Sequence, residues 1–161
     1  MPDHLGEIHL RNLLLSATVS ELTRETQFRL SPTDTIATAI SFLRDRNHGC
    51  ALICDSRGLL GIVTERDILQ ALNTDIDLAK PLTTIMSSEP TTVSANASLF
   101  QAISLMVSGG YRHLPVLDAD GTPAGVVDVK TLTGFLVEHF PEAIYNCASL
   151  ADITTRHREG A

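Results

Sequence analysis

The chain has 161 residues, of which 43% are hydrophobic, and it carries a formal net charge of −7 at pH 7. This length and composition are enough for the core of one compact domain. The acidic balance argues against nucleic acid or an anionic membrane surface as the main partner, because a polyanion would repel the chain at long range.

The N-terminal segment, residues 1–16, predicts a helical extension. Leu5, Ile8, Leu13 and Leu14 give it an amphipathic pattern. We expect this extension to cap the core or to join a dimer interface.

Residues 17–75 predict the order helix, strand, turn, strand, helix. The run Ser31-Pro32-Thr33-Asp34 supplies an N-cap, a proline at the first helical position and an acid three residues on, so we expect a helix to begin there. The apolar residues that follow at helical spacing are Ile36, Ala39, Ile40 and Leu43. A short apolar strand at 50–54, a turn at 55–58 and a second strand at 59–63 come next, and Thr64 opens another helix.

Residues 76–138 repeat this order. Ser94 begins a stretch that matches the one from Ser31, 63 positions earlier (94 − 31), and one extra residue near Pro123 makes the later offset 64 (125 − 61). A duplication of this kind predicts two similar α/β units packed around a pseudo-twofold axis. Because a unit of about 60 residues is marginally stable alone, we expect the two to share one core.

The segments around the two copies are less informative. Residues 80–86 have an echo at 17–22, so the repeating unit begins upstream of its first helix. The uncharged stretch 90–111 is interrupted by Ser, Asn, Gln and Gly, which predicts a buried helix rather than a membrane span. Residues 139–161 predict a short helix and a polar tail.

The pattern resembles the tandem cystathionine-β-synthase-type domain, or CBS domain pair, also called a Bateman module. The resemblance rests on the duplicated helix-strand-strand-helix unit, on Tyr111-Arg112-His113-Leu114-Pro115-Val116 and on Gly61-Ile62-Val63-Thr64-Glu65-Arg66-Asp67. It covers roughly residues 19–137. It implies an adenosine-containing ligand in clefts between the repeats, a disc-shaped homodimer, and regulation of another protein.

The first copy carries the residues suited to a nucleotide. The carboxylate of Asp67 offers two acceptor oxygens to the 2′ and 3′ hydroxyls of a ribose. The amides of the helix start and the Thr64 hydroxyl attract a phosphate, with Arg66 close enough to assist. Thr64 and Asp67 also fit a capping box, a purely structural alternative that stays open.

The second copy departs from this pattern. Asp128 stands at the threonine position and Thr131 at the aspartate position. Asp128 can still cap a helix, but a carboxylate repels a phosphate and Thr131 cannot pair with a diol as an aspartate does. We therefore expect one competent cleft, and a degenerate second cleft around Asp128, Lys130, Thr131, His48 and Cys50.

The resemblance further implies that each cleft is composite. Beside Thr64, Asp67, Arg66 and Ile62, the ligand-binding residues it implies are Thr83, Thr84, Ile85, Met86, Tyr111, Arg112, His113 and Pro115. The apolar members would hold the adenine and Arg112 would turn toward the phosphates. Tyr111 as ordinary core and His113 as a satisfied histidine within the sheet are the structural alternatives.

A metal or redox site is an alternative at one strand. His48, Cys50, Leu52 and Cys54 alternate, so they are expected to share a face where zinc could bind. Buried small hydrophobes are the better interpretation of both cysteines, and we expect no metal. No nucleophile-base-acid arrangement or glycine-rich phosphate loop is visible, so we expect no catalysis.

These features predict a regulatory module that needs no cofactor and binds an adenine nucleotide (AMP, ADP or ATP) as its ligand. The alternatives are a ligand-free dimerisation scaffold and a binder of S-adenosylmethionine, NAD or a cyclic dinucleotide. The odd count of three cysteines, without framework spacing, is typical of a reducing compartment. The start of the chain is acidic, with Asp3 and Glu7, so we expect no secretory signal and a cytoplasmic protein.

Overall fold

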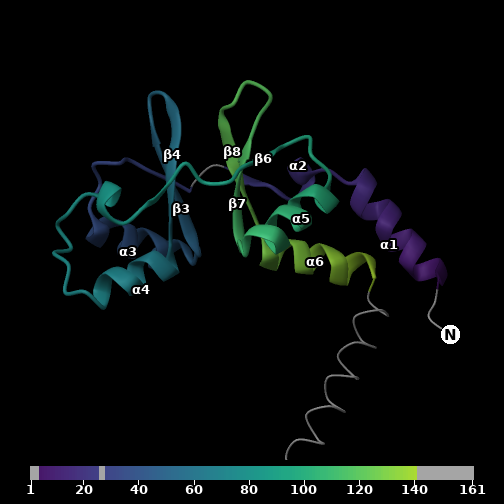
Figure 1. The fold of residues 1–161 in the computed structure, drawn as a ribbon, viewed down its shortest axis with the longest axis horizontal. Helices are drawn as coiled ribbons and strands as arrows, with labels where there is room; N and C mark the ends of the chain where they lie inside the picture. Colours follow the sequence, from purple (N-terminus) through teal and green to yellow (C-terminus); the bar gives the residue numbers. More distant parts are fainter. Residues whose placement is uncertain (1–3, 26–27, 141–161) are drawn as a thin grey trace, which may run out of the picture.

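The protein is a mixed α/β structure in which two similar units stand side by side (Figure 1). The computed structural model describes residues 4–25 and 28–140. The first unit contains β2 (Arg29–Leu30), α3 (Ile36–Arg46), β3 (Cys50–Asp55), β4 (Gly58–Thr64) and α4 (Glu65–Leu72). The second contains β6 (Val93–Ser94), α5 (Leu99–Gly109), β7 (His113–Leu117), β8 (Pro123–Asp128) and α6 (Val129–His139). The duplicated order predicted from the sequence is confirmed.

The start of α3 differs from the prediction. The helix begins at Ile36, and its N-cap is Thr35, whose hydroxyl accepts a hydrogen bond from the Thr38 amide at 3.1 Å. Ser31, the predicted cap, instead donates its amide to Asp34 Oδ2 at 2.7 Å and closes a separate turn. Ser98 caps α5 at the position equivalent to Thr35, so the two helices begin alike.

Each unit is completed by a short segment from elsewhere in the chain. The strand orders are β2-β3-β4-β5 and β1-β8-β7-β6, where β5 is Ser87–Ser88 and β1 is Arg24–Glu25. The 3-10 helix η1 (Leu82–Thr84) precedes β5 on the first sheet, and α2 (Val19–Leu22) precedes β1 on the second. The sequence that opens each repeat therefore pairs with the other repeat's sheet.

Hydrogen bonds confirm that the two opening segments are equivalent. The Ile36 amide at the start of α3 donates to the Lys80 carbonyl, and the Leu99 amide at the start of α5 donates to the Ala17 carbonyl, both at 3.0 Å. Lys80 and Ala17 are 63 positions apart (80 − 17), the offset of the repeat. The echo between residues 80–86 and 17–22 thus corresponds to one structural role.

Alternation along the strands divides the apolar residues between two faces of each sheet. In the first sheet Ala51, Ile53 and Val63 join the first core, which also includes Ile36 and Leu82. In the second sheet the residues that join the second core are Leu114, Val116 and Val127, together with Val19, Leu99 and others. The helices α3 and α4 cover the face of the first sheet that carries the first core, and α5 and α6 cover the face of the second sheet that carries the second core (Figure 1). We call these the outer faces.

The inner faces of the sheets meet across a third, smaller group. This inter-repeat cluster consists of Phe28, Cys50, Leu52, Ile62 and Val126. The expectation of a single core is wrong, because the described residues form three clusters. The repeats nevertheless share the two larger ones, since Val19 of the first repeat lies in the second core and Leu82 of the second repeat lies in the first. The inter-repeat cluster and the exchanged opening segments connect the two units.

The helices α5 and α1 bear on the prediction of a buried helix within 90–111 and on that of an N-terminal helical extension. In α5, Phe100 is 47% and Val107 78% exposed, so this helix is buried on one side only. The helix α1 (His4–Ser16) occupies the N-terminal segment, and Leu14 packs against the second core. Among the described residues, no helix is both long and apolar enough to cross a membrane. The predicted tail after residue 140 lies outside the described residues.

Candidate functional site

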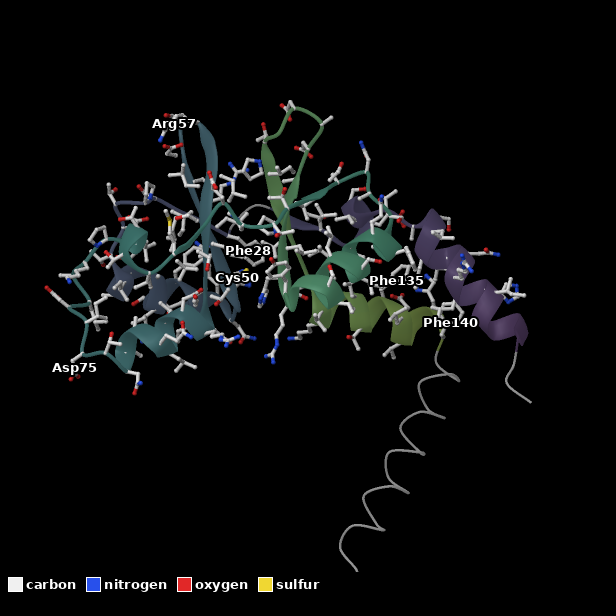
Figure 2. All side chains as sticks on the ribbon, in the orientation of Figure 1. Phe28, Cys50, Arg57, Asp75, Phe135 and Phe140 are labelled. Carbon is white, nitrogen blue, oxygen red and sulfur yellow. The ribbon has the colours of Figure 1, made fainter. Side chains whose placement is uncertain are left out.

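A cavity of about 520 Å³ opens between the two repeats where α4 and α6 begin. Its lining comes from both repeats and consists of Phe28, Asn47, His48, Gly49, Cys50, Glu65, Arg112, His113, Asp128, Val129 and Lys130. Figure 2 shows Phe28 and Cys50 between the two sheets at this place. We call this cavity the central pocket.

His113 crosses the boundary between the repeats. It begins β7 and lies opposite Asp128 in the β7–β8 ladder. Its ring lies against the backbone of Gly49 in the first repeat, where a Cβ atom would approach Nε2 to 2.8 Å. Burial lowers the pKa of His113, while the negative charges of Asp128 and Glu65 oppose that shift. Glycine at position 49 therefore leaves room for an imidazole from the other repeat.

The opposite wall of the pocket is less polar. The Phe28 ring stacks on His48, with 4.0 Å between the ring centroids. Cys50 is 1% exposed, and burial, reinforced by Asp128 and Glu65, raises the pKa of its thiol to about 12. The wall formed by Phe28 and Cys50 continues into the inter-repeat cluster.

Thr64 and Asp67 form a capping box at the start of α4. The Thr64 amide donates to Asp67 Oδ2 at 2.8 Å, the Thr64 hydroxyl donates to the same oxygen at 2.7 Å, and the Asp67 amide donates to Thr64 Oγ1 at 3.4 Å. The structural alternative considered from the sequence is therefore present. Asp67 Oδ1 accepts no hydrogen bond from the described part of the chain, so it can still accept one from a ligand.

In the second repeat Asp128 caps α6 as predicted. Its Oδ1 accepts a hydrogen bond from the Thr131 amide at 2.7 Å. Asp128 and Lys130 line the central pocket together with His48 and Cys50, whereas Thr131 does not. Four of the five residues assigned to the degenerate cleft thus lie at one cavity.

The residues assigned to the competent cleft are distributed over three places. Arg112 and His113 line the central pocket, but Thr64, Arg66 and Asp67 do not. Ile62 lies in the inter-repeat cluster. Pro115 is fully buried and follows His113 by two positions on β7, so the two side chains share the inner face.

The linker residues of that cleft lie against the first sheet. Thr83 and Thr84 are exposed in η1, while Ile85 and Met86 pack against the first core. A Cβ atom on Gly61 would lie 2.8 Å from the Met86 sulfur, so this glycine permits the close contact. These four residues thus lie on the β5 side of β4, away from the pocket lining.

Tyr111 is neither pocket lining nor core. It is 43% exposed, and the Thr91 hydroxyl donates to its hydroxyl at 3.2 Å. Its ring lies against Gly109, where a Cβ atom would approach the ring to 2.0 Å. The alternative of ordinary core is wrong for Tyr111, because its side chain is partly exposed and its ring turns back over the end of α5.

Several lining residues were missed from the sequence. Phe28, Asn47, Gly49, Glu65 and Val129 were not assigned to either cleft. Glu65 and Val129 follow the helix caps directly, so the predicted helix starts could have indicated them. Phe28 precedes any predicted strand, and only the three-dimensional arrangement brings it to the pocket.

The proposed metal or redox face is only partly formed. β3 begins at Cys50, so His48 lies before the strand and is not part of its alternation. Cys50, Leu52 and Cys54 do share the face of the inter-repeat cluster. Within residues 4–25 and 28–140, no group of three or more His, Cys, Asp or Glu side chains could hold a metal ion.

Burial of Cys50 predicts an unreactive thiol. The thiolate is the nucleophile in alkylation, and the raised pKa makes it rare near pH 8. We expect iodoacetamide to modify Cys50 at least about a hundredfold more slowly in the folded protein than in urea. Mass spectrometry of peptides after timed labelling measures this rate. Cys54, which is only partly buried, is the internal control and should react faster. Equal rates for Cys50 with and without urea would contradict the prediction.

Comparison with known protein families identifies the family of this chain. Residues 19–74 and residues 82–138 each match the CBS domain. The chain belongs to the CBS domain family. The two matches begin at α2 and at η1, so each includes the opening segment that pairs with the other repeat's sheet.

Relatives of this CBS pair include short and long proteins. The "uncharacterized 17.7 kDa protein in bps2 3'region" of Acidianus ambivalens is 30% identical over 126 residues, 77% of this chain and 76% of that protein. The CBS domain-containing protein YhcV of Bacillus subtilis is 33% identical over 104 residues, 64% of this chain and 74% of that protein. By contrast, the 109 residues matched in CBSCBSPB3 of Arabidopsis thaliana, at 29% identity, are 65% of this chain but 19% of the plant protein.

Solved structures share the arrangement of the CBS pair. The CBS domain protein PAE2072 from Pyrobaculum aerophilum, complexed with AMP, matches with a TM-score of 0.68 and 28% identity over 72% of this chain and 90% of that chain. The CBS domain NE2398 matches with a TM-score of 0.70 and 26% identity over 75% and 98%. CBSX2 in complex with AMP, at 22% identity and a TM-score of 0.66, has the same fold.

Proposed function

We propose that this CBS pair is a regulatory module that binds an adenine nucleotide, AMP, ADP or ATP, between its two repeats. The observation that carries the proposal is the central pocket, whose lining is shared by both repeats and includes Arg112 and Lys130. The complex of PAE2072 with AMP, a pair 28% identical to this chain, supports an adenosyl ligand. The family indicated is that of a binding domain, so we infer no catalytic activity.

Each part of the nucleotide has suitable partners in this proposal. The free Oδ1 of Asp67 accepts from a ribose hydroxyl while Oδ2 keeps the helix capped. Arg112 and Lys130 neutralise phosphate, aided by the amides that begin α4 and α6. Apolar side chains hold the adenine. Thr64, Arg66, Asp67 and several other residues predicted from the sequence do not line the central pocket, and they stay candidates for contacts with parts of the ligand that extend beyond it. These others are Ile62, Thr83, Thr84, Ile85, Met86, Tyr111 and Pro115.

A ligand at this place would act on the orientation of the repeats. The two larger cores form separate clusters, so a bound molecule that contacts both repeats favours one relative orientation. A partner protein that binds one orientation better would sense the ligand by the same difference in free energy. We infer that the module signals in this way as a cytoplasmic homodimer, with light scattering as the test of the dimer.

A ligand-free dimerisation scaffold is the second candidate. The capping box favours it, because Thr64 and Asp67 satisfy each other without a ligand. Asp128 in the central pocket also favours it, because its charge repels phosphate. S-adenosylmethionine, NAD or a cyclic dinucleotide would be alternative ligands of the same site.

Calorimetric titration with AMP, ATP, NADH and S-adenosylmethionine tests the proposal. We expect one adenine nucleotide to bind per chain. Asp67→Asn should weaken it about 10- to 150-fold, because a hydrogen bond to a charged group is worth about 1.5–3 kcal/mol. The asparagine side chain keeps an oxygen that can accept from the Thr64 amide, so this variant removes the charge while Thr64 still caps α4.

The matched control is Asp128→Asn in the second repeat. It changes the equivalent helix cap, and it should leave the affinity unchanged or raise it, because it removes a charge that repels phosphate. Absence of binding by all four ligands, with an intact homodimer, would favour the scaffold. Binding of S-adenosylmethionine alone would redirect the proposal to a ligand without phosphate.

A further inference from the structure

The fixed charges of the central pocket cancel. Glu65 and Asp128 each contribute one negative charge, and Arg112 and Lys130 each contribute one positive charge. The thiol of Cys50 is neutral at physiological pH, because burial raises its pKa to about 12. The remaining titratable groups of the lining are His48 and His113. The net charge of the central pocket therefore depends on whether an imidazole carries a proton.

His113 is placed to be that imidazole. Asp128 lies opposite it at the end of β8, and Lys130 follows in α6. Glu65 reaches the pocket from the start of α4, Arg112 precedes His113 in the chain, and His48 and Cys50 belong to the wall beside Gly49. His113 thus faces charged or titratable groups from every element that surrounds it.

The environment of His113 favours the neutral ring in the absence of a ligand. Burial lowers its pKa from 6.5, and Arg112 acts in the same direction, whereas Asp128 and Glu65 favour the protonated ring. A phosphate dianion in the pocket would add its negative charge to those two carboxylates. Negative charge within about 4–6 Å favours the protonated form of an imidazole.

We propose that His113 is a selectivity residue of the central pocket, whose protonation makes the pocket cationic and favours phosphorylated nucleotides over neutral adenosine. This inference rests on the proposed function. It adds that His113 takes up a proton when the nucleotide binds. Nucleotide binding takes up a proton at His113, and acidification strengthens nucleotide binding by the same coupling. Adenosine, which has no phosphate, gains nothing from the proton.

The direction of the pH dependence follows from the two pKa values of His113. The ligand-bound pKa is higher than that of the free protein, so the added affinity is fully present below the free pKa. It is lost as the pH rises through the bound pKa. Each unit between the two pKa values corresponds to about a tenfold change in affinity.

Calorimetric titration with AMP and with adenosine between pH 5 and 8 tests this inference, using the wild type, His113→Gln and His48→Gln. The phosphate of AMP itself titrates with a pKa of about 6, so the quantity to compare is the ratio of wild-type to variant affinity at each pH. We expect the AMP ratio for His113→Gln to rise about tenfold from pH 8 to pH 5. The adenosine ratio should stay constant. His48→Gln removes the other imidazole of the lining, and whatever it does to the affinity itself, it should leave the pH dependence of AMP binding in place.

The outcomes separate this inference from the proposed function. Either of two results overturns the selectivity role of His113 while the nucleotide module stands. In one, AMP binds with a ratio of wild-type to His113→Gln affinity that does not depend on pH. In the other, His48→Gln alone abolishes the pH dependence of AMP binding. If neither ligand binds at any pH, the proposed function fails, and this inference fails with it. NMR titration of the His113 ring in the wild-type protein needs no variant to fold. Its pKa should rise when AMP is added, and an unchanged pKa would overturn the inference.

Discussion

Replacing Leu114 with alanine is expected to lower the free energy of unfolding by about 2–5 kcal/mol. Leu114 is the second residue of β7, is 0% exposed and belongs to the second core. Its removal loses the transfer free energy of the side chain and leaves a cavity that a packed sheet and helix cannot close. Urea denaturation followed by circular dichroism measures the change.

The matched control for Leu114 is Leu69 in α4. Leu69 is also a leucine in a regular element, but it is 67% exposed. Leu69→Ala should change the free energy of unfolding by no more than about 0.5 kcal/mol. Equal losses in the two variants would contradict the burial described for β7.

Replacing Leu52 with aspartate is expected to cost at least roughly 3–5 kcal/mol and to separate the unfolding of the two repeats. Leu52 is 1% exposed and belongs to the inter-repeat cluster, where a carboxylate has no water and no basic partner among the other cluster members. The two cores themselves remain intact, because Leu52 belongs to neither. Calorimetry should therefore resolve two transitions in place of one.

Leu52→Ala provides the comparison for the charged variant. It removes the same side chain from the inter-repeat cluster without adding a charge, so it should destabilise the protein less than Leu52→Asp. Ile53→Ala, one position along on the opposite face, should instead destabilise the first core. A single transition with a loss below about 1 kcal/mol in Leu52→Asp would show that the cluster does not couple the repeats.

Local signals in the sequence predicted the elements but not all of their contacts. The repeat offset, the turns and the Thr64 cap identified every long strand and helix of the two units. The start of α3 was misplaced because Ser31 and Thr35 are both good caps, and Ser31 is instead satisfied in a turn with Asp34. The single shared core was wrong because burial on one face of a strand says nothing about which sheet covers the other face.

The candidate site was the harder part to predict. The alternation of β7 places His113 and Pro115 on one face, which the sequence shows. It does not show that Gly49 leaves space for the His113 ring, because Gly49 lies in the other repeat. The position of the Tyr111 ring was equally hidden, since its contact with Gly109 follows from the turn after α5. Contacts between distant segments depend on packing that no local pattern encodes.

The exchange of opening segments has a consequence for synthesis on the ribosome. Glu25 of β1 pairs with Gly125 of β8, 100 positions later in the chain (125 − 25). Ala17 and Val19, both buried in the finished protein, therefore emerge long before the sheet that covers them. A nascent chain that stops after the first repeat exposes these apolar residues and is open to proteases. Release of a stable product is thus linked to translation of the second repeat.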